Sequence, residues 1–312
     1  ERGYDVVLVE AHRVGFGASG RNGGQLGSGQ RVGQHRLERM MGLEDAQRLW
    51  QLGEASKDLV KSLIGRHDID CRLKPGIANL ALTAAEMAEL HVESAHLSQH
   101  YGYDQITPLD RAAAQALCPS PAYHGGYLDH GAGHLHPLAF ALGLARAAKA
   151  AEVRIFERSE VTSITQSAKP VISCRDGSVI CNYAILACNG YLGQLNRRVA
   201  ARVMPINNFI AATEPLGAET AKVLTQDIAV ADTKFVVNYF RLSHDGRLLF
   251  GGGENYSYHF PTDIAAKVRR PMLKIFPHLR DIKIDYAWGG TLAITANRMP
   301  YLTRLGDTIL SA

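Results

Sequence analysis

The apolar positions in the first third of the chain predict a strand followed by helices. Residues 6–9 form an uninterrupted apolar run that ends at Glu10, which is the pattern of a strand buried on both faces of a parallel sheet. Apolar residues then recur at helical spacing over residues 44–66 and 84–101. A shorter helix is expected at 107–117, where a Thr-Pro pair stands at its start.

The rest of the chain is predicted to contain more strands than helices. A strand is expected at 73–82, with Pro75-Gly76 as a turn or bulge within it. Residues 127–137 are expected to form turns that lead into a helix rich in Ala and Leu. Residues 235–242 and 247–251 are predicted to be the two strands of a hairpin, because Ser-His-Asp-Gly between them is a good turn sequence.

The composition is that of a globular protein, and it excludes several classes of function. The chain has 312 residues, of which 46% are hydrophobic and 21% charged, so it can form a sizeable core in about two domains. The formal net charge is +4, but acidic and basic residues are mixed along the chain, which argues against nucleic-acid binding. No apolar stretch approaches the roughly 20 residues that a transmembrane helix needs.

The cysteines and histidines do not predict a metal site. Five cysteines are scattered along the chain without a C-x-x-C pair, so neither zinc binding nor a redox dithiol is expected. Such cysteines fit a reducing compartment, and we therefore expect a cytoplasmic protein. Four histidines between residues 124 and 136 match no helical H-E-x-x-H pattern. We expect these histidines in turns or at the start of a helix, and we expect no metal site.

The most informative stretch of the sequence is rich in glycine. Eight glycines lie within residues 15–33, here called the glycine segment, and residues 17–25 read Gly-Ala-Ser-Gly-Arg-Asn-Gly-Gly-Gln. Glycine lets the backbone approach a ligand closely, and successive exposed N–H groups form a concave site for phosphate. Ser19 and Asn22 add hydrogen-bond donors, and Arg21 adds positive charge. The alternative is a flexible linker, although linkers rarely follow a buried strand directly.

Glu10 has a candidate role at the end of the first strand. In nucleotide-binding βαβ units, an acid binds ribose hydroxyls about 20 residues after a G-x-G-x-x-G loop. No such loop precedes Glu10, so we expect the chain to begin just after it. Residues 307–312 look like a core strand with nothing after it, so we expect the C-terminal end to be cut short as well. An ordinary acid at the end of a strand is the alternative for Glu10.

Four stretches occur in the order found in one family of flavoenzymes. They are residues 6–10, 17–25, 187–192 (Ala-Cys-Asn-Gly-Tyr-Leu) and 288–291 (Trp-Gly-Gly-Thr). With them the chain resembles the D-amino-acid-oxidase-like FAD oxidoreductases, a family that includes glycine and sarcosine oxidases. Residues 212–216 and 239–242 extend the resemblance to the gamma-glutamylputrescine oxidoreductases and related polyamine-pathway enzymes. The resemblance implies FAD as cofactor, held non-covalently, because no residue matches a covalent attachment site.

The resemblance implies an α/β fold. A Rossmann-like FAD-binding domain is expected to be interleaved with a substrate domain of mixed β-sheet and helices. The FAD-binding domain is expected to use residues 1–74, 136–200 and 288–312 and to be incomplete, and the substrate domain to use residues 75–135 and 201–287. Asn189 stands where a predicted strand ends in a glycine turn, a favourable position for a ligand contact in such folds.

The resemblance also implies roles for individual residues. Glu10 is expected to hold the adenosine ribose, and the backbone of Val161 to contact the adenine side of the cofactor. The residues expected beside the pyrophosphate are Ala18, Ser19 and Gly20, with the charge of Arg21 close by. The residues expected near the flavin ring are Asn22, Gly24 and Gln25, and those expected beside the ring on the substrate side are Trp288, Gly289 and Gly290.

The expected reaction is hydride transfer from an amine-bearing carbon to the flavin, which gives an imine that water hydrolyses to an aldehyde. Tyr239 and Arg241 are two residues apart on a predicted strand, so they share a face. Arg241 is the candidate for binding a substrate carboxylate such as that of a gamma-glutamyl group. The alternative is a surface arginine on a half-exposed strand. With Trp288, these two residues are the candidate catalytic residues, and the expected electron acceptor is oxygen or a quinone.

Three functions stay open on the sequence alone. The first is oxidation of a small-molecule amine, gamma-glutamylputrescine or a related gamma-glutamylated polyamine. The second is oxidation of a D-amino acid, sarcosine or glycine, whose carboxylate is next to the reacting carbon and needs a cation close to the flavin. The third is a non-catalytic role, as an inactive fragment or as a flavoprotein subunit that works only with a partner.

Overall fold

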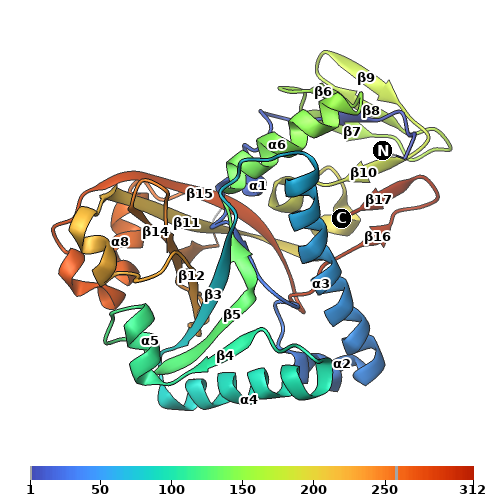
Figure 1. Cartoon of the computed structure of the whole chain (residues 1–312). Helices are drawn as coiled ribbons and strands as arrows, with labels where there is room; N and C mark the ends of the chain where they lie inside the picture. The colour runs from blue at the N-terminus through green and yellow to red at the C-terminus, as the bar shows by residue number, and fades with distance from the viewer. Residues whose placement is uncertain (1, 257–258) are drawn as a thin grey trace.

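The computed structural model describes residues 2–256 and 259–312 and shows a mixed α/β architecture (Figure 1). Its largest unit is a curled nine-stranded sheet in the order β15-β11-β14-β13-β12-β3-β5-β2, in which β4 also pairs with β5. The pairs are antiparallel except for β12 and β3, which are parallel. The strands of this sheet are β2 (Gln25–Leu26), β3 (Lys74–Ala81), β4 (Ile106–Leu109), β5 (Gly125–His134), β11 (Val203–Pro215), β12 (Ala229–Asp232), β13 (Tyr239–Leu242), β14 (Arg247–Asn255) and β15 (Ile284–Thr295).

Three smaller sheets gather at the other end of the molecule, at the upper right of Figure 1. Two of them contain the parallel pairs β1-β6 and β10-β17, which are the Rossmann-like part of the fold. The third is an antiparallel meander, β7-β8-β9. Their strands are β1 (Val7–Val9), β6 (Arg154–Phe156), β7 (Val161–Ile164), β8 (Val171–Cys174), β9 (Gly177–Ile180), β10 (Ala184–Leu186), β16 (Thr303–Arg304) and β17 (Ile309–Ser311).

The helices cover the large sheet and link it to the smaller ones. They are α1 (Ala18–Arg21), α2 (Gln34–Met41), α3 (Leu43–Arg66), α4 (Ala84–Tyr101), α5 (Arg111–Leu117), α6 (Pro137–Ala150), α7 (Arg197–Ala200) and α8 (Ile264–Ile275). The limits of α4 have clear local causes. Thr83 accepts a hydrogen bond from the backbone N–H of Glu86 at the start, and Gly102 adopts the left-handed conformation after the end. No helix in the described part of the chain is long and apolar enough to cross a membrane.

The main hydrophobic core lies between the large sheet and helices α5 and α8. Phe240 and Phe250 stack in parallel with ring centroids 5.6 Å apart, and Phe276 meets Phe240 edge to face at 5.1 Å. All three rings are fully buried, so they contribute large apolar areas and favourable ring geometry. A second core joins the small sheets. It includes Leu186 and Ile309, which lie on the neighbouring parallel strands β10 and β17.

Several sequence-based predictions are confirmed by this structure. Helices α3 and α4 cover the ranges expected from the apolar spacing. The pairing of β3 with β5 shifts register between Pro75 and Ile77, which is the expected bulge. The hairpin between β13 and β14 is closed by the backbone N–H of Gly246 bonding the carbonyl of Ser243.

Two predictions about residues 107–137 are wrong. Residues 125–134 form strand β5 and not a series of turns. This strand is rich in glycine, and it exists because β3, β4 and β2 pair with it, which the local sequence does not reveal. The helix expected from residue 107 begins only at Arg111, where Asp110 caps it, and the residues before it pair with β5 as strand β4.

The first strand also differs from its prediction. The side chains of Val6 and Leu8 are 41% and 42% exposed, so β1 is not buried on both faces. Among the described residues β1 pairs with β6 alone.

The stacked phenylalanines give a prediction about stability. Replacing Phe250 by Ala is expected to lower the free energy of unfolding by about 3–5 kcal/mol, because it leaves a cavity among fully buried neighbours. The matched control is Phe235→Ala, since Phe235 is 71% exposed, and its effect is expected to stay below about 1 kcal/mol. Urea unfolding followed by circular dichroism measures both, and equal losses would contradict this description of the core.

Candidate functional site

The glycine segment folds into a compact loop that Asn22 holds together. The side-chain amide of Asn22 donates to the carbonyls of Ala18 at 2.9 Å and Ser19 at 3.1 Å. Its Oδ1 accepts a hydrogen bond from the backbone N–H of Gly24 at 2.7 Å. These bonds end helix α1 and turn the chain into β2. The expected pyrophosphate residues therefore lie on α1, and Ser19 is exposed there.

Two glycines of the loop are required by close backbone packing. A Cβ atom on Gly20 would lie 2.0 Å from the carbonyl oxygen of Gly15. A Cβ atom on Gly24 would lie 1.9 Å from the carbonyl oxygen of Leu135, and Gly24 also has a φ of +76°. Any other residue at these positions would clash or strain the backbone. The structure thus explains why glycine is needed here.

The loop is fastened to β15 by two reciprocal hydrogen bonds. The indole Nε1 of Trp288 donates to the carbonyl of Arg21 at 3.0 Å, and Nη1 of Arg21 donates to the carbonyl of Gly289 at 3.1 Å. A Cβ atom on Gly290 would meet no atom closer than 3.5 Å, the nearest being Cβ of Arg21. The structure therefore brings Arg21 together with Trp288, Gly289 and Gly290, which lie more than 260 residues later in the sequence.

A buried polar network supports the far end of the glycine segment. The Nζ of Lys57 on α3 lies 2.7 Å from both Ser28 Oγ and Glu54 Oε2, and Glu54 accepts a bond from the N–H of Gly29. The hydroxyl of Tyr103 bonds Ser28 and donates to Asp129 on β5 at 2.7 Å. The side chain of Lys57 is only 3% exposed, so this ion pair is costly to break and fixes the segment against α3 and β5.

A cavity of about 270 Å³ lies between the loop and the large sheet. Its walls come from the glycine segment, from β11, β13, β14 and β15, and from the hairpin turn before β14. Gly20, Asn22, Gly23, Tyr239, Arg241 and Trp288 all line it, as do apolar residues such as Ile210 and Leu249. The candidate catalytic residues thus face one cavity together with the glycine loop, and the prediction that Tyr239 and Arg241 share a face is confirmed.

Arg241 is the central polar group of the cavity. It is only 8% exposed, so the alternative of a surface arginine is wrong. Its Nε donates to the carbonyl of Gly23 at 2.8 Å and its Nη1 to the carbonyl of Leu242 at 3.2 Å. Burial lowers the pKa of Arg241 to about 10, although Asp227 opposes this from a distance. Among the described residues no carboxylate is within ion-pair distance of its guanidinium, so the charge is available to a ligand.

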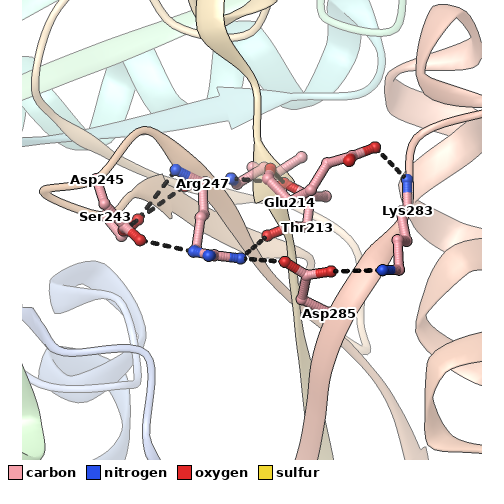
Figure 2. A network of polar contacts seen from close by, with 8 residues as sticks. Thr213, Glu214, Ser243, Asp245, Arg247, Lys283 and Asp285 are labelled. Atoms are coloured by element: carbon pink, nitrogen blue, oxygen red, sulfur yellow. Dashed lines mark hydrogen bonds and ion pairs between the residues drawn. The ribbon is translucent and has the colours of Figure 1, made fainter.

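Arg247, which lines the same cavity, has its charge already neutralised. Figure 2 shows its guanidinium between two carboxylates, with Nε 2.6 Å from Asp245 and Nη1 2.6 Å from Asp285. Nη1 also donates to the carbonyl of Thr213 at 2.9 Å. These bonds raise the pKa of Arg247 above its ordinary value. Unlike Arg247, Arg241 is buried in the cavity and has no carboxylate within ion-pair distance among the described residues.

Two further side chains in the cavity are neutral hydrogen-bonding groups. The hydroxyl of Tyr239 donates to Asn208 Oδ1 at 2.6 Å, and burial raises the pKa of this phenol, so it stays protonated. The ring of Tyr239 packs where Gly23 and Gly251 have no side chain. His136 caps α6 by accepting from the N–H of Ala139, and burial lowers the pKa of its imidazole.

Other predicted residues lie outside the cavity. Gln25 uses its side-chain amide to bond the carbonyl of Val230 at 2.8 Å, which links β2 to β12. Asn189 has a φ of +48°, and its Oδ1 accepts from the N–H of Ala293 on β15 at 2.7 Å. Glu10 follows β1, where Oε1 accepts from the N–H of His12 at 2.9 Å. Val161 begins β7 and packs on the core of the small sheets.

Sequence reasoning missed several residues that line or support the cavity. Asn208, His136 and His244 come from three separate segments, and their convergence depends on the register of the large sheet. The pairing of Asn208 with Gly290 on β15 places Asn208 beside the expected flavin stretch, but nothing in the local sequence indicates it. Gly23 and Gly251 carried a weak signal, because an isolated glycine in or near a strand indicates close approach by another group.

The arrangement fits a flat, extended cofactor. Gly20 and Gly23 line the cavity without side chains, so its wall there is backbone that a ring can approach closely. The loop offers backbone N–H groups, and Arg21 and Arg241 supply positive charge nearby. The donors are therefore of the kind that a phosphate-bearing flavin requires.

The comparisons with known proteins agree with this geometry. The family described as FAD dependent oxidoreductase (DAO) matches residues 1–311. The chain is 41% identical to the probable oxidoreductase OrdL of Rhizobium meliloti (strain 1021), over 96% of this chain and 70% of that protein. It is 36% identical to the gamma-glutamylputrescine oxidoreductase of Escherichia coli (strain K12), over 99% of this chain and 73% of that protein.

The solved structures show the same fold at lower sequence identity. Glycine oxidase from Geobacillus kaustophilus superposes with a TM-score of 0.78 at 20% identity, over 100% of this chain and 82% of that one. L-proline dehydrogenase from P. horikoshii superposes with a TM-score of 0.71 at 16% identity, over 98% and 87%. The match over nearly the whole chain shows that the chain belongs to the family of FAD-dependent oxidoreductases.

Proposed function

We propose that the protein oxidises a gamma-glutamylated amine, with gamma-glutamylputrescine as the substrate and non-covalent FAD as the cofactor. The observation that carries the proposal is Arg241, a buried guanidinium without an ion-pair partner among the described residues, in a cavity beside the glycine loop. A buried arginine recognises a carboxylate strongly because of its fixed pair of donors. The 36% identical relative that is named for gamma-glutamylputrescine supports the choice of substrate.

The cofactor contacts are proposed from the same geometry. Glu10 and the backbone of Val161 would hold the adenosine end, and Ala18, Ser19, Gly20 and Arg21 the pyrophosphate. The flavin ring would lie along Asn22, Gly24 and Gln25, with Asn189, Trp288, Gly289 and Gly290 on the side of β15. The FAD-binding domain in this proposal comprises residues 1–74, 136–200 and 288–312, and the substrate domain 75–135 and 201–287. Strand β15 runs through the last of these boundaries.

Bound FAD would accept a hydride from the carbon that bears the amine, and the protein prepares the substrate for this step. The amine must be neutral to lose the hydride. The apolar side chains of Ile210, Ala212 and Leu249 exclude water, which lowers the pKa of an ammonium group. Arg241 would fix the far end of the substrate by binding its carboxylate.

Tyr239 and Trp288 would then orient the substrate between the sheet and the flavin. Both side chains are held in place, Tyr239 by Asn208 and Trp288 by the carbonyl of Arg21. No dedicated acid or base is needed for hydride transfer from a neutral amine. The neutral phenol of Tyr239 and the imidazole of His136, whose pKa burial lowers, are two hydrogen-bonding groups that line the cavity.

A second candidate is oxidation of a D-amino acid, sarcosine or glycine. Arg241 also suits such a substrate, but the carboxylate would then have to lie next to the reacting carbon. The two candidates differ in the distance between carboxylate and amine, so substrates of different length distinguish them. A non-catalytic role is the third candidate. It would require that the protein bind flavin without being reduced by any of these amines.

The location and the electron acceptor complete the proposal. All five cysteines are free thiols, which supports a reducing, cytoplasmic compartment. Oxygen or a quinone would reoxidise the flavin. The proposed reaction forms an aldehyde. The enzyme would therefore act in polyamine breakdown, before a step that consumes an aldehyde.

The function is tested by the effect of Arg241→Gln on two substrates. Gamma-glutamylputrescine carries a carboxylate and putrescine does not, so the variant is expected to raise KM for the first by roughly 30-fold or more. Activity on putrescine is expected to fall much less, because that substrate loses only the support that the bond from Arg241 to Gly23 gives the loop. Arg241→Lys keeps the charge and should lose less, and Arg48→Gln, on an exposed face of α3, is the neutral control.

Other outcomes of the same experiment would contradict the proposal. Reduction of the flavin by sarcosine or D-amino acids, and not by gamma-glutamylputrescine, would favour the second candidate. An equal loss on both amines would show that Arg241 is structural. If the protein binds flavin and no amine bleaches its absorbance under anaerobic conditions, the result would support the non-catalytic role. Retention of FAD by each variant, read from its absorbance, separates these results from misfolding.

The glycine loop gives a second prediction at this site. A Cβ atom on Gly23 would lie 2.6 Å from the ring of Tyr239, so Gly23→Ala must displace that ring or the loop. We expect kcat/KM to fall by roughly 10- to 100-fold, because a displacement of this size misplaces the substrate. Gly27→Ala is the matched control, since a Cβ atom there meets nothing within 4 Å. Equal activity of the two variants would contradict the placement of Tyr239 against the loop.

A further inference from the structure

Three side chains with metal-binding atoms converge between α2 and α4. None of them lines the cavity that the candidate catalytic residues share. His35 and Glu38 are three residues apart on α2 and so lie on one face of the helix. His96 projects from α4 toward them, with Nε2 2.7 Å from Glu38 Oε1. The imidazoles of His35 and His96 stack with ring centroids 3.7 Å apart. One ligand atom from each of the three residues lies within 4.8 Å of the other two.

We propose that His35, Glu38 and His96 form a binding site for a divalent transition-metal ion such as Zn²⁺. Two imidazoles and one carboxylate are a ligand set that zinc accepts, with a fourth position left for water. Zinc bonds of about 2.0–2.1 Å place tetrahedral ligand atoms roughly 3.3 Å apart. The ligand atoms now lie within 4.8 Å of one another, so binding requires them to move closer and the stacked imidazoles to turn their nitrogens toward one point.

The carboxylate ligand is oriented by further hydrogen bonds. The hydroxyl of Tyr101 donates to Glu38 Oε1 at 2.6 Å, and Gln34 Nε2 bonds that hydroxyl at 3.1 Å. Gln34 is itself buried and anchored to the carbonyl of Ala46. Such supporting partners are characteristic of metal sites, because they fix the position of a ligand.

The surroundings allow an ion to reach the site. A cavity of about 440 Å³ opens between α2 and α4, and His35 forms part of its wall. Arg36 and Arg39 also line it and repel a cation, but Glu89 and Glu93 line the opposite side. The side chains of His96 and Glu38 are 11% and 19% exposed, so the ligands are held within the protein but remain accessible. These features meet the need for a route by which the metal can enter.

The site was not visible in the sequence. The cluster of histidines in the sequence lies between residues 124 and 136. His96, in contrast, is 58 residues away from Glu38 along the chain. A bound ion would join α2, which directly follows the glycine segment, to α4. The expected effect is therefore on stability. Without metal, α2 and α4 are joined by the hydrogen bonds from Tyr101 and His96 to Glu38 and by those of Gln34 with Glu93 and Tyr101.

The test is a Zn²⁺ titration of the full chain after treatment with a chelator. We expect one equivalent of Zn²⁺ to bind and to raise the melting temperature, because the ion binds the folded state. Co²⁺ in its place should give the visible absorbance of a tetrahedral site. His35→Ala and His35→Asn are both expected to weaken Zn²⁺ binding by more than about 100-fold, and Tyr101→Phe by roughly 10- to 100-fold.

His100→Ala is the matched control, because His100 contacts the ring of His96 but is not one of the three ligands. It should bind Zn²⁺ as the unmodified protein does. Failure of the unmodified protein to bind one equivalent would overturn the proposal. Equal affinity in His35→Asn and in the unmodified protein would overturn it too, since the ion would then be held by other residues. Circular dichroism of each variant shows that a loss of binding is not a loss of folding.

Discussion

The site depends on how three carbonyl groups of a glycine-rich loop and a neighbouring strand are held. Trp288 donates to the carbonyl of Arg21, Arg21 donates to that of Gly289, and Arg241 donates to that of Gly23. Glycine-rich backbone has a high conformational entropy, so it keeps one shape only when such contacts fix it. The same contacts connect the glycine segment to β15, at one edge of the large sheet, and to β13, in its middle.

The charges around the cavity explain which arginine is free for a ligand. Arg247 is neutralised by Asp245 and Asp285, as Figure 2 shows, and it serves to fasten the hairpin turn to β15. Arg241 lies in a less exposed place and bonds only backbone carbonyls among the groups that the structure describes. A buried cation of this kind is costly unless a ligand neutralises it. In the proposed function, the carboxylate of the substrate is that ligand.

Much of the fold could be predicted from the sequence wherever the signal is local. Helix α4 has its cap residues and its apolar spacing in one short stretch, and the glycine segment has its loop chemistry in another. Strand β5 could not be predicted, because its glycines disfavour a strand and the pairing with three neighbours outweighs that preference. The residues that support the site could not be predicted for the same reason. Asn208 reaches Tyr239 only through the register of non-adjacent strands.

The most direct measurement is a crystal structure of the protein with FAD and glutamate bound, since glutamate carries the same α-carboxylate as a gamma-glutamyl group. The account predicts the flavin ring between the glycine loop and Trp288. It predicts a ligand carboxylate within hydrogen-bond distance of the Arg241 guanidinium. A flavin bound elsewhere, or a carboxylate that contacts other cations while Arg241 bonds only Gly23 and Leu242, would contradict the account.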